Sequence, residues 1–219
     1  MMNFFRYVIC CGVFCAGAKT AFAGAGVEGT VVLPKAAAGN VTPSRYQNKT
    51  PGEVGSPEKP VAVVYLEGTF PTSARTNASV SAKVLQEHFQ FSPVVLPVQI
   101  GTSVDFPNLD DSYHNVFSYS KSKRFDLGRY RKEEKPAAVV FDKAGAVKLY
   151  CEIHEHMRGV VLVLDTPHFT RTDTNGLYRL EHLPAGKFVL KAWLNESKVI
   201  ERPVELRDGE TLKVNFADK

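Results

Sequence analysis

Short runs of β-branched and aromatic residues, separated by turn sequences, are the feature that most constrains the fold of this chain. Clear runs lie at residues 27–33, 61–66, 94–100 and 160–164, and glycine turns such as Asn175-Gly176 separate later ones. No long segment repeats its apolar residues with the period of a helix. Strands this short and closely spaced are typical of β-sandwiches, so the sequence predicts an all-β protein.

Two stretches depart from this pattern. Residues 34–60 contain five prolines among Gly, Ser, Asn and Lys, which predicts a loop or an extended linker. Residues 121–135, which begin with Lys121 and end with Lys135, contain seven basic residues and three acids. We expect this basic stretch to be a solvated loop. It could still steer an acidic partner, because charged patches raise encounter rates.

The first 23 residues have the features of a secretory signal peptide. Arg6 precedes a 12-residue apolar stretch, and the small residues Ala21 and Ala23 fit an A-x-A cleavage site. We therefore expect export, most simply to a bacterial periplasm. The mature chain would begin near Gly24.

The charge and the length of the apolar runs exclude two further classes. The formal net charge is only +4, whereas duplex binding usually leaves a clustered basic stripe, so we expect no nucleic-acid binding. No uncharged apolar run reaches 18 residues, so we expect no membrane-spanning helix.

Cysteine usage indicates where the chemistry lies. Cys10, Cys11 and Cys15 fall in the predicted signal peptide, which leaves Cys151 as the single thiol of the mature chain. Exported proteins usually place cysteines in disulfides, and Cys151 has no partner for one. It could pair between chains, lie buried and inert, or bind a metal.

The residues around Cys151 favour a metal. Cys151 is followed by His154, His156 and Met157, and His114 lies 37 residues upstream. A thiolate, two imidazoles and a weak axial thioether are the ligands of copper electron-transfer sites, whereas zinc usually takes a tetrahedral set without a thioether. Each residue alone would have an ordinary structural role, but the Cys-x2-His-x2-Met spacing is specific. We predict that His114, Cys151 and His154 bind copper, with Met157 as the axial ligand.

These residues resemble those of the cupredoxins, the small blue copper proteins. The resemblance covers about residues 82–165, with His114-Asn115-Val116 similar to the first-ligand motif and residues 147–157 similar to the ligand loop. The short spacing from Cys151 to Met157 is most similar to that of amicyanin and is longer in plastocyanins. The resemblance implies a Greek-key β-sandwich, one mononuclear type 1 copper site and an electron-carrier role.

The resemblance also implies roles for the neighbours of the ligands. It implies that Asn115 stiffens the site through hydrogen bonds. It implies that the ring edge of His154 is exposed in the ligand loop and is the exit for electrons. His156 is a possible alternative ligand, but its spacing from Cys151 would require a methionine at position 160, which is Val160. We therefore prefer His154 and expect His156 to lie exposed nearby.

The rest of the chain is similar to a second β-sandwich family. Residues 173–180 and 183–190, with their turns and alternating strands, resemble the carboxypeptidase regulatory-like domain. Residues 27–31 and 63–68 are similar to its opening strands. The whole arrangement resembles exported two-module proteins labelled methylamine utilisation proteins, although no residues here indicate an amine-binding site.

These similarities predict a discontinuous domain organisation. Residues 24–81 and 166–219 would form the carboxypeptidase regulatory-like sandwich, with the copper domain, residues 82–165, inserted between its strands. In the simpler alternative, residues 61–81 belong to the edge of the cupredoxin and the C-terminal part is a separate small unit.

The sequence favours a periplasmic electron carrier whose partner is a redox protein such as a cytochrome or a dehydrogenase. The alternative is copper storage or delivery, or a partner-binding module without electron transfer. Storage is disfavoured because the mature chain has one methionine and its six histidines form no tract. No enzymatic role is expected, because the His-Cys-His run of multicopper oxidases and the two-cysteine motif of dinuclear centres are absent.

Overall fold

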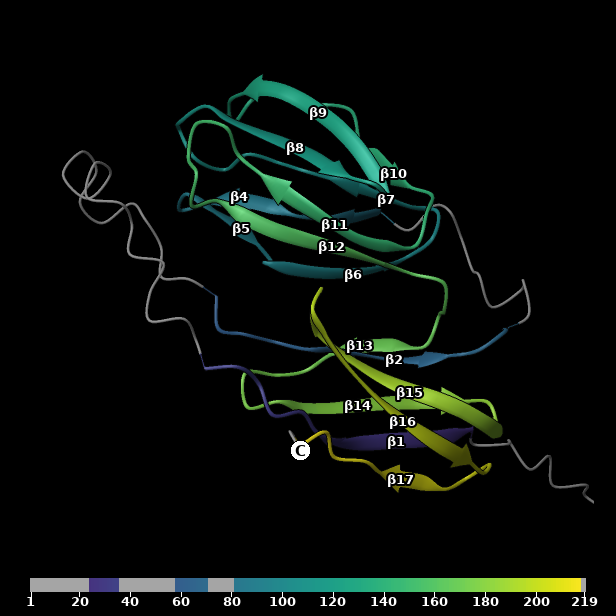
Figure 1. Cartoon of the computed structure of the whole chain (residues 1–219). Helices are drawn as coiled ribbons and strands as arrows, with labels where there is room; N and C mark the ends of the chain where they lie inside the picture. Colours follow the sequence, from purple (N-terminus) through teal and green to yellow (C-terminus); the bar gives the residue numbers. More distant parts are fainter. Residues whose placement is uncertain (1–23, 36–57, 71–80, 218–219) are drawn as a thin grey trace, which may run out of the picture.

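The computed structural model describes residues 24–35, 58–70 and 81–217 (Figure 1). The predicted signal peptide and most of the proline-rich stretch lie outside the described residues. So do residues 71–80, near the end of the first predicted segment of the discontinuous domain, and residues 218–219, at the end of the second.

The described residues form strands and no helix, which confirms the predicted all-β class. Accordingly, this part of the chain contains no helix that could cross a membrane. The strands are β1 (Ala25–Thr30), β2 (Val63–Glu67), β3 (Ser81–Lys83), β4 (Leu85–Glu87), β5 (Gln90–Ser92), β6 (Val95–Gln99), β7 (Thr102–Asp105), β8 (His114–Ser120), β9 (Lys123–Tyr130), β10 (Val139–Phe141), β11 (Gly145–Tyr150), β12 (Arg158–Leu164), β13 (Phe169–Arg171), β14 (Leu177–Leu183), β15 (Gly186–Asn195), β16 (Lys198–Leu206) and β17 (Thr211–Lys213).

Strands β3 to β12 form one sandwich, the upper body in Figure 1. Its larger sheet has the order β6-β12-β11-β8-β9, its smaller sheet has the order β10-β7-β3, and β4 and β5 pair beside them. Strand β6 lies parallel to β12, far along the chain, so a long connection and not a hairpin joins this pair. Val104 and Phe141 of the smaller sheet share a buried core with Val147 and Val161 of the larger one.

Strands β1, β2 and β13 to β17 form a second sandwich, the lower body in Figure 1. Its sheets have the orders β14-β1-β17 and β13-β2-β15-β16. Val27 and Tyr178 of the first sheet pack in one core with Leu66 and Leu190 of the second. Strands that precede the upper body in the sequence therefore pair with strands that follow it.

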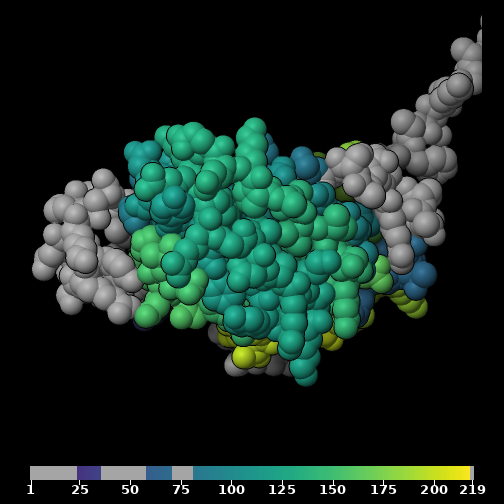
Figure 2. Space-filling model, turned by 90° about the horizontal axis from the view of Figure 1, so that it is seen from above, coloured from purple at the N-terminus to yellow at the C-terminus, as the bar shows by residue number. Residues whose placement is uncertain are grey.

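A third apolar cluster joins the two sandwiches. Leu162 and Leu164 of β12 lie in it with Val63 of β2 and Trp193 of β15, while Val161 points into the upper core. Strands β12 and β2 are thus buried on both faces, which explains why they are continuous apolar runs rather than alternating ones. Viewed from above, the teal and green atoms of the upper body fill most of the molecule, and the yellow C-terminal strands appear mainly at the rim (Figure 2).

The basic stretch is not a solvated loop. Most of it is β9, an edge strand paired antiparallel with β8 from His114↔Tyr130 to Ser120↔Lys123. Phe125 and Leu127 face inward and pack on the upper core, while the charged neighbours between them face outward. The prediction was wrong because charged residues of the outer face dominate the composition of this stretch and hide the alternation of apolar and polar residues that is typical of a strand.

Candidate metal centre

The predicted histidine and cysteine ligands meet where β8 begins and β11 ends. His114 is the first residue of β8, Cys151 directly follows β11, and His154 lies in the short loop that leads to β12. Strands β8 and β11 are neighbours in the sheet, with Tyr150 opposite Phe117. Two adjacent strands and one tight loop therefore position all three side chains.

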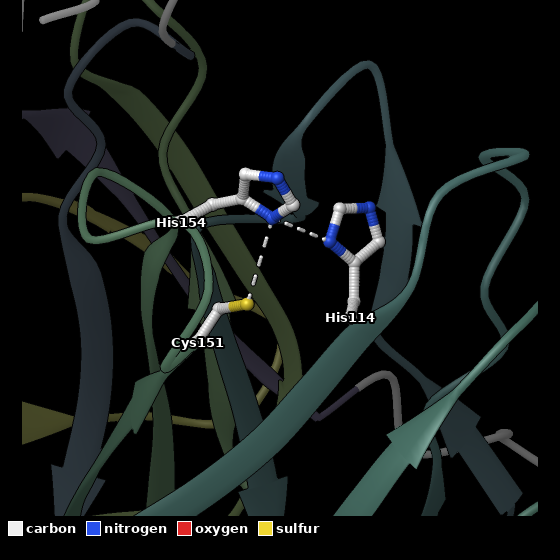
Figure 3. Close-up of side chains that lie close together, drawn as sticks. All are labelled: His114, Cys151 and His154. Carbon is white, nitrogen blue, oxygen red and sulfur yellow. Dashed lines mark hydrogen bonds between the residues drawn. The ribbon is translucent and has the colours of Figure 1, made fainter. Parts of the chain in front are cut away.

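The donor atoms of the three side chains converge on one point (Figure 3). One ligand atom of each lies within 4.8 Å of the others. Nδ1 of His154 lies 2.9 Å from Nδ1 of His114 and 3.8 Å from Sγ of Cys151. A soft sulfur and two imidazole nitrogens this close together form a set that a single metal ion could bridge.

This cluster is enclosed by the protein. His114 is fully buried, Cys151 is 4% exposed and His154 is 7% exposed. The ring of Phe89 packs edge-to-face on both imidazoles, with centroid distances of 5.4 Å to His114 and 4.9 Å to His154. The expectation that the ring edge of His154 is exposed is therefore wrong, because Phe89 and the rest of the site cover it.

The surroundings of Cys151 favour its thiolate. Burial alone would raise the pKa of Cys151. Polar contacts with the rings of His114 and His154, and hydrogen bonds from the backbone N–H groups of Asn115 and His154, lower the pKa further than burial raises it, to about 5. The thiolate is the form that binds metals, so these polar contacts hold the thiol in its ligand form despite the apolar core.

The charge balance around His114 works in the opposite direction. Burial lowers the pKa of His114, but the hydrogen bond to Asp110 and the proximity of Cys151 raise it, and the net direction is upward. Burial also raises the pKa of Asp110, while hydrogen bonds from His114 and from the backbone of Phe89 and His88 lower it more. The site therefore places two anionic groups, the Cys151 thiolate and the Asp110 carboxylate, on either side of His114.

Backbone hydrogen bonds fix the loop that carries the ligands. Oδ1 of Asn115 accepts a hydrogen bond of 2.7 Å from the backbone N–H of Glu152. This bond connects the strand of His114 to the loop of Cys151 and His154. Within the loop, the N–H of Met157 donates to the carbonyl of His154 at 2.9 Å and closes a turn.

Met157 and His156 occupy different environments. Met157 is fully buried and belongs to the same core cluster as Cys151. His156 is half-buried, with its ring centroid 6.2 Å from that of His154, so the expectation that it is exposed is wrong. Burial lowers the pKa of His156, as do the charges of His154 and His114. The three-residue cluster found among the described residues contains His154 and not His156.

Two neighbours of the cluster were not predicted from the sequence. Asp110 receives a hydrogen bond of 2.8 Å from Nε2 of His114 at its Oδ2, and Phe89 covers both rings. The position of Asp110 four residues before His114 is the one signal that could have indicated it. Phe89 comes from a turn that sequence spacing does not connect to the site.

Comparison with known proteins finds no matching protein family and no matching curated protein. Among solved structures, the chain is similar to a Cu-containing nitrite reductase (NirK) from Thermus scotoductus SA-01, with 24% identity and a TM-score of 0.36. That match covers 39% of this chain and only 22% of the reductase.

Two smaller copper proteins match over most of their own length. A single-site mutant of amicyanin in its Cu(I) form has 22% identity and a TM-score of 0.36, over 46% of this chain and 98% of amicyanin. A purple cupredoxin from Nitrosopumilus maritimus has 25% identity and a TM-score of 0.34, over 38% of this chain and 99% of that protein. Similarities of this size do not assign the chain to a family.

Proposed function

We propose that this protein binds one copper ion in a mononuclear type 1 site and carries single electrons between redox partners. The observation that carries the proposal is the convergence of Cys151, His114 and His154, which are all buried and whose ligand atoms lie within 4.8 Å of one another. Met157, buried in the same core, is the proposed axial ligand. When bound, copper would supply the one-electron redox couple.

The donor chemistry supports copper. A thiolate with two imidazoles and a distant thioether suits copper electron-transfer sites, whereas structural zinc sites rarely include a thioether. The ligands come from two hydrogen-bonded strands and a loop tied by Asn115. A frame held in this way keeps the donor atoms in place when the charge of the ion changes, which favours electron transfer over catalysis.

Export is part of the proposal and depends on the sequence alone. The predicted signal peptide lies outside the described residues. Cys151 is free and buried, and a metal-binding role explains why a lone thiol is present in a chain with an export signal.

We also propose that residues 24–81 and 166–219 form one carboxypeptidase regulatory-like domain, into which the copper domain of residues 82–165 is inserted. The pairing of β2 with β13 and β15, and of β1 with β14 and β17, supports this proposal.

The proposed partner is a redox protein such as a cytochrome or a dehydrogenase, with an acidic docking surface. The basic stretch extends along the eight residues of β9, so its two ends are separated by at least the length of that strand, about 25 Å. Tyr130 is opposite His114, which places Arg129, Arg131 and Lys132 at the metal end of the sheet. The proposed docking surface is therefore the metal end of the stretch rather than its whole length.

The visible spectrum tests the copper proposal. One equivalent of Cu(II) should produce an intense blue absorption that ascorbate removes and reoxidation restores. Cys151→Ser should lose this absorption, because the charge-transfer band requires a thiolate. His182→Asn is the matched control: His182 is exposed, and its φ of 55° suits asparagine, so the colour should persist.

Two outcomes would contradict the proposal. A blue Cys151→Ser variant would show that the ligand is misassigned. A wild-type protein that stays colourless and releases its copper readily to a chelator would favour storage or delivery of copper instead.

A further inference from the structure

The carboxylate of Asp110 accepts three hydrogen bonds. Oδ2 accepts from Nε2 of His114 at 2.8 Å and from the backbone N–H of Phe89 at 2.9 Å. Oδ1 accepts from the backbone N–H of His88 at 2.8 Å. One side chain therefore connects the first proposed copper ligand to the turn between β4 and β5.

The loop that carries Asp110 is itself held in place. The backbone N–H of Asp110 donates to Oδ1 of Asn108 at 2.9 Å. The amide of Asn108, which is 1% exposed, donates to the carbonyls of Ser112 at 2.9 Å and Tyr130 at 3.0 Å. These contacts fix the position of Asp110 before any metal binds.

The contact with Asp110 determines which nitrogen of His114 faces the cluster. A carboxylate only accepts hydrogen bonds, so the Nε2 atom of His114 must carry the proton. In the neutral ring Nδ1 then has a free lone pair, and this is the atom that points toward His154. Asp110 thus presents His114 in the tautomer that can bind a metal through Nδ1.

The same carboxylate holds the turn that covers the site. His88 and Phe89 have φ values of 53° and 57°, a left-handed conformation that is unfavourable for a non-glycine residue. Both of their N–H groups bind Asp110, which offsets this cost. As a result the ring of Phe89 lies against both imidazoles.

We propose that Asp110 is a positioning residue of the copper site, which sets the tautomer of His114, holds Phe89 over the imidazoles and stabilises Cu(II) relative to Cu(I). This inference rests on the proposed copper function. A hydrogen-bonded carboxylate makes the ring of His114 a stronger donor, and its negative charge favours the more highly charged ion. Asp110 therefore lowers the reduction potential of the site.

The first part of the test uses the metal-free wild-type protein and does not depend on copper. Nitrogen-15 NMR of the neutral ring of His114 should show the proton on Nε2. The amides of His88 and Phe89 should exchange slowly with solvent. A proton on Nδ1 of His114 would overturn the proposal without the need for any variant.

The second part compares Asp110→Asn with Asp111→Asn. Asp111 is the matched control, because its side chain is 97% exposed and its ion pair with Lys132 spans 3.9 Å. Each substitution removes one negative charge from the same loop, but the first one alone alters the contact with His114. We expect Asp110→Asn to speed amide exchange at His88 and Phe89, to weaken Cu(II) binding about 10- to 100-fold, and to raise the reduction potential. Asp111→Asn should change none of these appreciably.

Equal shifts in potential and affinity for the two variants would overturn the positioning role, because they would show a general charge effect. The experiment distinguishes a failure of the copper proposal from a failure of the positioning proposal. If the tautomer and the amide exchange depend on Asp110 but copper gives no blue colour, the copper proposal fails and the positioning of His114 by Asp110 stands.

Discussion

The cluster of Cys151, His114 and His154 contains a charged thiolate, although it lies in an apolar core. A thiolate in such a core is costly unless positive charge or hydrogen-bond donors compensate it. Here the ring of His154 and two backbone N–H groups supply donors, and Asp110 adds a second negative charge at 2.8 Å from His114. A bound cation would balance both anions, so the metal-free cluster is the less stable state. Copper binding should therefore raise the melting temperature of the protein.

At the same scale, Met157→Leu tests the axial ligand. Leucine has nearly the volume of methionine, so the fully buried site should accept it for less than about 1.5 kcal/mol. The variant should bind copper and stay blue, because the thiolate and both imidazoles remain. Its reduction potential should rise, since loss of a sulfur donor destabilises Cu(II) more than Cu(I). Potentiometric titration measures this, and an unchanged potential would show that Met157 is core packing only.

Some residues of the site could be predicted from the sequence and others could not. The Cys-x2-His-x2-Met spacing predicted three neighbouring positions of one loop, and the structure brings His114 to that loop through the pairing of β8 with β11. Asp110 and Phe89 could not be predicted in this way. Their roles depend on the conformation of two turns, and turn geometry is specified by contacts that are distant in the sequence.

Strand β9 shows how an element can be misjudged when its outer face is charged. Its inward residues, Phe125 and Leu127, alternate with charged or glycine positions, and the strand ends at the buried Tyr130. Strands β6 and β12 were predicted well, as the runs 94–100 and 160–164, because their β-branched and apolar residues dominate. The three-residue strands β3, β4 and β13 were missed, since so few residues give no detectable period.

The pairing of β9 with β8 makes the docking proposal testable, because one end of β9 lies beside the proposed copper site and the other end lies far from it. Arg131 is exposed beside the metal end, with its guanidinium 4.3 Å from the centre of the Tyr113 ring. Arg131→Glu should slow electron exchange with hexacyanoferrate(III), an anionic probe, about fivefold at low ionic strength, which corresponds to about 1 kcal/mol. Stopped-flow recovery of the blue colour, starting from the ascorbate-reduced protein freed of ascorbate, measures the rate.

Arg124→Glu is the matched control for this charge reversal. Arg124 is exposed on the same strand, opposite Tyr119 and near the far end of the sheet, so its replacement should have a much smaller effect. High salt should remove the difference between the two variants, because it screens exposed charges. Equal rates for both variants at low salt would contradict docking at the metal end.

At the scale of the whole molecule, the apolar cluster between the sandwiches couples their stability. The chain passes twice between the two bodies, once after β2 and once after β12. The outer face of β12 is buried against β2 and β15 through Leu162, Leu164 and Trp193. The residues of this contact could not be predicted from the sequence. The continuous apolar runs of β12 and β2 indicate only that both faces of each strand are buried. We expect both sandwiches to unfold together.

Leu162→Ala tests this coupling, and Trp193 is a built-in probe because it is the single tryptophan of the chain. Leu162 is 5% exposed and Trp193 is 6% exposed in the same cluster. The substitution should lower the free energy of unfolding by about 2–5 kcal/mol and shift the tryptophan emission to longer wavelength, since water reaches the indole. Val161→Ala, on the same strand but facing the upper core, should destabilise the protein without this shift. If urea unfolding of Leu162→Ala matched the wild type in both midpoint and emission, the two sandwiches would be independent bodies joined only by the chain.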